Sequence, residues 1–205
     1  MLKGNIVMSL LLLFCISCTN EQKLEHEAKR NNIESIDQLT DYYLNTLHSN
    51  YAKALYWATV GAKLNDPEAI YNLAYLITDT VRKFSLEQKA AFLEYTPAMF
   101  AMAMYYLDKP KPDNDSAFFW LNAAANEGDK NDYKMLGDFY YKGIGTKQDY
   151  NMALLYYKKG CAGYIENNTA CCDSVLWMLK NRPDTLDLRY WREHAKQVVI
   201  PFNYK

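Results

Sequence analysis

The sequence predicts an all-α protein, built as a solenoid of antiparallel helix pairs that ends in a capping helix. Three observations carry this prediction: apolar residues recur at helical spacing from Ile33 onward, no stretch alternates convincingly as a strand, and small residues recur at intervals of 36, 27 and 36 residues. The 205 residues are 50% hydrophobic and 23% charged, with a net charge of −1. This composition excludes a disordered chain and argues against a nucleic-acid binder. The 18 tyrosines are unusually many and need a reason.

The N-terminal segment predicts export. Lys3 precedes an apolar run from Ile6 to Cys18, which is too short to span a bilayer. The close of the run, Ser17-Cys18 followed by polar residues, resembles the lipobox of bacterial lipoproteins, although Cys15 departs from that pattern. The resemblance implies that Cys18 is lipidated and becomes the new N-terminus. An ordinary signal peptide cut nearby, or an uncleaved anchor, is the alternative.

The expected organisation has three parts. Residues 1–17 are a lipoprotein signal peptide, residues 18–32 a polar tether with some helical character, and residues 33–199 the helical solenoid. By the same resemblance, Thr19 in place of an Asp favours an outer-membrane lipoprotein that faces the periplasm.

The helices are expected in order along the chain. A first apolar stripe runs over 33–47, and residues 52–66 supply half of a unit. Two kinds of helix then alternate, each with its own pattern of small and large residues. The second helices are marked by Ala54/Trp57, Ala90/Leu93, Ala117/Trp120 and Ala153/Tyr156. The first helices are marked by the segments that begin at Ala69, Ala98, Asp132 and Cys171. Neither helix can bury its apolar face alone, so neighbours must stack.

The clearest unit runs from Asp132 to Lys159. Gly143 is placed for a left-handed C-cap and Asp149 for an N-cap. The unit resembles the Sel-one-like repeat, a relative of the tetratricopeptide repeat, at the following positions: Leu136, Gly137, Tyr140, Gly143, Gly145, Asp149, Ala153 and Tyr156. Residues 98–128 form a second match, and residues 69–93 a degenerate one with a shortened second helix.

The resemblance covers about residues 52–180 and implies a right-handed α-solenoid. After Pro183, a last helix capped by Asp184 or Thr185 is expected to run to Pro201 and to present a polar outer face.

No catalytic, metal or cofactor constellation is found. The three histidines, His26, His48 and His194, are isolated from one another and from a nucleophile. The Gly143–Gly145 loop joins two helices, so it does not fit a dinucleotide-binding turn. The acidic segment 113–115 is explained by helix capping rather than by calcium. We therefore expect a protein that is not an enzyme and has no cofactor.

Three cysteines remain after the signal peptide and Cys18. In the cysteine-rich Helicobacter-type members of the family, a disulfide joins two helices at the positions of Cys161 and Cys172, and the resemblance implies this pairing here. Pairing of Cys161 with Cys171, or three free thiols, is the alternative.

The first helices of such repeats line the concave face, which implies a partner-binding groove. Residues two before and two after each motif leucine are expected to point into it, with Tyr141 one turn further along. The expected partner-binding residues are Tyr71, Tyr75, Phe100, Met104, Asp138, Tyr141 and Trp177, beside Lys134 and Asp173. Aromatic residues and Met are enriched at protein interfaces. If the register slips by one, several of them are core residues instead.

The resulting hypothesis is a lipid-anchored module that binds a protein or peptide and no nucleic acid. By family analogy it could be an immunity protein that neutralises a secretion-system toxin of the phospholipase type, or an adaptor or regulator of envelope proteins. A β-lactam hydrolase, as attributed to some cysteine-rich relatives, is the less favoured alternative. Its candidate nucleophiles, Ser174 and Cys171, have no histidine nearby in the sequence.

Overall fold

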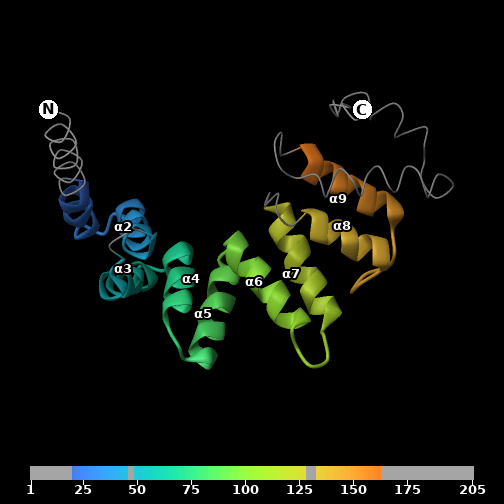
Figure 1. Ribbon diagram of the computed structural model, residues 1–205, viewed down its shortest axis with the longest axis horizontal. Coiled ribbons are helices and arrows are strands. Elements are labelled where there is room, and N and C mark those ends of the chain that lie inside the picture. The colour runs from blue at the N-terminus through green and yellow to red at the C-terminus, as the bar shows by residue number, and fades with distance from the viewer. Residues whose placement is uncertain (1–19, 46–48, 128–132, 163–205) are drawn as a thin grey trace, which may run out of the picture. The chain divides into compact units, whose positions relative to one another are not determined.

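The computed structural model describes residues 20–45, 49–127 and 133–162, with side chains up to residue 160 (Figure 1). Helices and their connecting turns make up these residues, and no strand occurs among them. The all-α prediction is therefore confirmed for this part of the chain. The chain divides into two compact units, unit 1 up to Ala98 and unit 2 from Met99 onward.

Unit 1 contains a helical segment over 20–28 and four further helices. These are α2 (Ile33–Asn45), α3 (Tyr51–Lys63), α4 (Pro67–Leu76) and α5 (Thr80–Phe92). Helix α2 packs on α3 and α4 packs on α5, while α4 also contacts both α3 and α2. The core between them includes Ile36, Leu39, Trp57 and Leu73.

Unit 2 takes most of α6 (Thr96–Leu107), followed by α7 (Asn114–Asn126), α8 (Tyr133–Lys142) and α9 (Tyr150–Ala162). Helix α8 packs closely on α9 and also contacts α7. Met102, Leu121, Leu136 and Leu154 are fully buried here.

Each second helix begins with the same capping arrangement. A side-chain oxygen of the N-cap residue accepts a hydrogen bond from a backbone N–H in the first turn, which satisfies one of the helix's free donors. The four N-caps are Asn50, Asp79, Asp113 and Asp149. They stand four residues before Ala54, Lys83, Ala117 and Ala153. The capping roles expected of Asp149 and of the 113–115 segment are thus confirmed.

This register corrects two sequence expectations. Helix α5 has 13 residues, as many as α3, α7 and α9, so the expectation of a shortened second helix is wrong. Ala90 does not correspond to Ala54, because Lys83 holds that position in α5. Ala90 instead corresponds to Gly61, since each accepts the hydrogen bond that closes the helix end, from Tyr95 N at 3.1 Å and from Asp66 N at 3.1 Å.

A second hydrogen bond recurs where a first helix turns into its partner. The N–H of the N-cap residue donates to the carbonyl oxygen of the motif tyrosine near the end of the first helix. The pairs are Asn50 to Tyr43 at 3.0 Å, Asp113 to Tyr106 at 3.0 Å and Asp149 to Tyr140 at 2.9 Å. The first pair shows that α2 and α3 form a complete unit, where the sequence suggested half of one. Gly143 has a positive φ of 69°, as its expected C-cap role requires.

The segment expected as a polar tether forms part of unit 1. Residues 20–28 are helical, and Ala28 is 1% exposed in the same core cluster as Ile36 and Leu39. The segment ends at Asn31, which has a positive φ of 63°, as do Asn65 after α3 and Glu94 after α5. Helix 20–28 therefore ends in the same way as the second helices α3 and α5. Its residue Ala28 packs in the core cluster that α2 also lines.

Candidate functional site

The two groove residues expected on α4 differ in their surroundings. Tyr71 is half-buried, and its ring lies 5.5 Å from that of Tyr95. Tyr75 is 73% exposed. Both lie off the buried seam of α4, which is formed by Ala69, Ile70, Leu73, Ala74 and Leu76.

The groove residues of unit 2 that the structure describes are partly buried. Phe100 and Met104 lie on α6, and neither is part of the fully buried core. Asp138 is occupied by internal contacts: its Oδ1 accepts a hydrogen bond from Tyr157 Oη at 2.5 Å, and its Oδ2 lies 2.9 Å from Lys134 Nζ. The ring of Tyr141 lies 5.4 Å from that of Tyr150. Asp138, which the sequence predicted to bind a partner, therefore already bonds to two side chains of this chain.

Other predicted site residues lie outside the described part of the chain. They are Cys18, Cys172, Trp177 and Asp173, together with the alternative candidates Cys171 and Ser174. Cys161 falls within α9, but its side chain is not described. The lipidation, disulfide and Trp177 assignments therefore stay predictions.

A cluster that the sequence reasoning missed lies where α2 meets α4. We call it the acid–aromatic face, and it comprises Asp37, Asp41, Asp66, Glu68, Tyr71 and Tyr95. Helix α2 supplies the first two, the start of α4 the next three, and the turn before α6 the last. Among the described residues, none of the four carboxylates has an ion-pair partner within 4 Å. A signal for it exists in the sequence, since no Lys or Arg occurs between Arg30 and Lys53.

Burial and mutual repulsion shape the electrostatics of this face. Burial raises the pKa of Asp37 to about 7, helped by the charges of Asp66, Glu68 and Asp41 and by a hydrogen bond with Asp66. Burial also raises the pKa of Glu68, with Asp41 and Asp66 adding to the effect. The pKa of Tyr95 rises for the same reasons, first from burial and then from Glu68. The face therefore holds excess negative potential that no described cation neutralises.

Within the face, Asp37 Oδ1 is buried and has no hydrogen-bond partner among the described residues. Asp66 is partly engaged, because its Oδ2 accepts a hydrogen bond from Ala69 N at 2.6 Å and so caps α4. Lys83 of the neighbouring helix α5 lies 3.8 Å from Glu87 and so has an acidic partner of its own. The face thus presents acceptors and aromatic rings together, which suits a cationic side chain.

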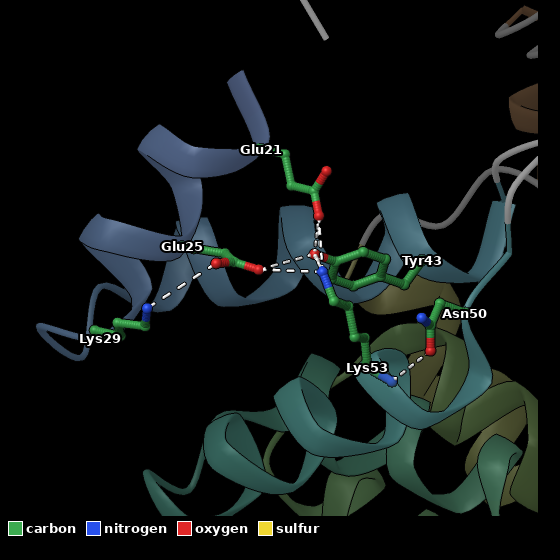
Figure 2. Close-up of polar contacts among 6 residues, drawn as sticks. All are labelled: Glu21, Glu25, Lys29, Tyr43, Asn50 and Lys53. Atoms are coloured by element: carbon green, nitrogen blue, oxygen red, sulfur yellow. Dashed lines mark hydrogen bonds and ion pairs between the residues drawn. The ribbon is translucent and has the colours of Figure 1, made fainter. Parts of the chain in front are cut away.

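A second polar cluster in unit 1 is internally satisfied. Figure 2 shows Lys53 of α3 reaching Glu21 and Glu25 of helix 20–28, at 2.9 and 3.3 Å, and Tyr43 Oη of α2 at 2.8 Å. Tyr43 Oη in turn donates to Glu21 at 2.5 Å. These bonds lower the pKa of Glu21, with Tyr43 the largest contributor and Lys53 the next. This cluster joins helix 20–28, α2 and α3. Because its charges are paired with one another, we assign it a structural role.

The described residues contain no group of three or more His, Cys, Asp or Glu side chains that could hold a metal ion. None of the helices in this part of the chain has the length and apolar character needed to cross a membrane.

The capped helix pairs and their small-residue seams define the protein as an α-solenoid repeat protein. The Sel1 repeat family model matches residues 47–66, 67–78, 96–129 and 133–163. The chain is thus a Sel1-repeat protein, as the sequence resemblance predicted. Sel1 repeats are protein-interaction modules.

Known proteins agree on the repeat. The chain is 28% identical over 124 residues to a Sel1-like repeat-containing protein of Schizosaccharomyces pombe, and this match covers 60% of the chain but 16% of that relative. A Sel1 repeat protein from Oxalobacter formigenes matches in fold with a TM-score of 0.69 and 23% identity, over 77% of this chain and 48% of that one.

A second solved structure is c5321, a protective antigen of uropathogenic Escherichia coli strains. It matches with a TM-score of 0.69 and 21% identity, over 86% of this chain and 41% of that one. At these identities the two structures show the fold alone. The chain spans less than half the length of each of these three relatives.

Proposed function

We propose that this chain is a lipid-anchored, periplasm-facing module that binds a protein partner, and that the partner places cationic side chains on the acid–aromatic face. The observation that carries the proposal is the set of four carboxylates beside two tyrosines, with no cation paired to them in the described residues. An Arg or Lys brought in by a partner would relieve the repulsion among the carboxylates and could stack on a tyrosine ring. Lipidation at Cys18 supplies the anchor in this proposal.

The face also suits fast and selective association. Like charges gathered on one surface attract an oppositely charged partner over about 8–10 Å at physiological salt. Tyr71 and Tyr95 add apolar area next to the charges, as protein interfaces commonly do. Helix 20–28 extends unit 1 almost to Cys18, so a lipid at that residue would hold unit 1 close to the membrane surface.

The test is affinity capture from membranes with the full chain. Asp41→Asn with Glu68→Gln removes two charges from the face. Asp108→Asn with Glu127→Gln removes two exposed carboxylates elsewhere and serves as the matched control. We expect one identified partner to be recovered by the wild type and the control, in a salt-sensitive manner, and to be lost with the face variant. Equal recovery by all three would exclude the face as the binding site.

Within this function, we favour immunity against a secretion-system toxin of the phospholipase type over an adaptor role in the envelope. The reason is the family analogy. The toxin would be encoded beside this chain. Deleting the chain should sensitise cells to that toxin, and unchanged growth would reject the immunity role. Turnover of a β-lactam by the purified protein would instead support the hydrolase alternative.

A further inference from the structure

The acid–aromatic face is also a packing contact between α2 and α4. Helices α2 and α4 contact each other, and Asp37 Oδ1 on α2 is buried with no hydrogen-bond partner among the described residues. The groups that face it are Asp41 on its own helix, Asp66 and Glu68 on α4, and Tyr95 before α6. All of these are acidic or neutral, so ionising Asp37 adds a charge among like charges.

Two lysines on helices of unit 1 pair with acidic residues outside the face. Lys53 of α3 lies within ion-pair distance of Glu21 and Glu25. Glu27 of helix 20–28 also contacts α2, since it accepts a hydrogen bond from Ser35 Oγ at 2.9 Å, and its own charge is negative. On α5, Lys83 lies 3.8 Å from Glu87. Among the described residues, no basic side chain forms an ion pair within 4 Å of the Asp37 carboxylate.

A proton on Asp37 removes this conflict. Burial and the neighbouring carboxylates raise its pKa from 3.8 to about 7. The protonated carboxyl can donate a hydrogen bond to Asp66, whose other oxygen caps α4. The proton therefore bridges α2 to the N-terminus of α4.

We propose that the carboxylates between α2 and α4 form a pH-responsive contact, which stabilises unit 1 in acid and loosens as Asp37 loses its proton. The sign follows from linkage. The folded state binds the proton more tightly than the unfolded state, so the stabilising effect is fully present below about pH 4 and is lost as the pH rises through about 7. The inference concerns unit 1 itself and holds whether or not the proposed partner binds.

The test is hydrogen exchange of the full chain at several pH values between 5 and 8. Exchange is measured for each proteolytic peptide and corrected for the intrinsic exchange rate. In the wild type, we expect protection of the α2 and α4 peptides to fall at least about tenfold across this range, since one pKa unit corresponds to a tenfold change in the opening equilibrium. In Asp37→Asn, whose amide imitates the protonated acid, protection should stay nearly constant and exceed the wild type at pH 8.

A control variant and a direct titration complete the test. The control Asp108→Asn changes an exposed carboxylate in unit 2 and should keep the wild-type pH profile. Carbon-13 titration of the wild-type carboxyls measures the Asp37 pKa without any substitution. An Asp37 pKa near 4, or the same pH profile in Asp37→Asn as in the wild type, would overturn the proposal.

Discussion

The replacement of Gly137 by Ala tests how closely the helix pairs pack. A Cβ atom on Gly137 would lie 2.5 Å from Tyr157 Cε1 and 2.6 Å from Tyr157 Cδ1, well inside van der Waals contact. The ring has little freedom to retreat, because Tyr157 is 3% exposed and its hydroxyl donates to Asp138. The variant must therefore separate α8 from α9 or distort the ring.

The expected cost follows from two opposing effects. Overpacking a tight core costs about 1–3 kcal/mol, whereas Ala gains about 0.5–1 kcal/mol over Gly within a helix. We expect Gly137→Ala to lower the free energy of unfolding by about 1–2 kcal/mol. This corresponds to a fall in Tm of about 4–8 °C per kcal/mol for a unit of this size.

A second substitution identifies the cause. In the repeat register, α7 carries Leu121 where α9 carries Tyr157, and α6 carries Ala103 where α8 carries Gly137. Gly137→Ala with Tyr157→Leu recreates that natural combination, so the double variant should be more stable than the sum of the single effects predicts. Urea unfolding followed by circular dichroism gives the energies, and hydrogen exchange locates the loss to α8 and α9. A Gly137→Ala variant as stable as the wild type would refute the close packing.

Three further outcomes are expected. Lys53→Met removes the cation that pairs with Glu21 and leaves Glu25 with only Lys29, 4.0 Å away, so exchange protection of helix 20–28 should fall by an amount equivalent to about 1–2 kcal/mol, with unit 2 unaffected. Gly145→Ala combines a positive φ of 60° with a Cβ 2.0 Å from Asn114 O, so thermal unfolding should show a loss of more than about 1 kcal/mol. Asp149→Ala removes the N-cap of α9 and should cost about 1 kcal/mol in urea unfolding; no change in any of these variants would contradict the contact concerned.

The sequence predicts the helix pairs because their pattern is local. Small residues, caps and glycine turns occur at short fixed distances, as in the unit from Leu136 to Tyr156. The repeat register predicted for α5 was wrong because Lys83 occupies the position where the other second helices carry Ala. Ala90 was therefore taken for that alanine. A search for N-caps rather than alanines would have found Asp79 in its place.

Helix 20–28 was harder to predict because its surface is mostly charged. Its place in unit 1 depends on Ala28 and on polar contacts to Tyr43 and Lys53, which are distant in sequence. The acid–aromatic face was missed for a related reason. Asp37 and Glu68 are ordinary surface residues by type, and their shared surroundings exist only once α2 packs on α4.

Recognition of a cationic partner should depend on the negative charge of the acid–aromatic face. The most direct measurement is the dissociation constant of the captured partner, by calorimetry at 50 and 300 mM salt, for the wild type and for Asp41→Asn with Glu68→Gln. We expect the variant to bind at least about tenfold more weakly at low salt, with a smaller dependence on salt than in the wild type. Equal affinity and equal salt dependence in the two proteins would contradict it.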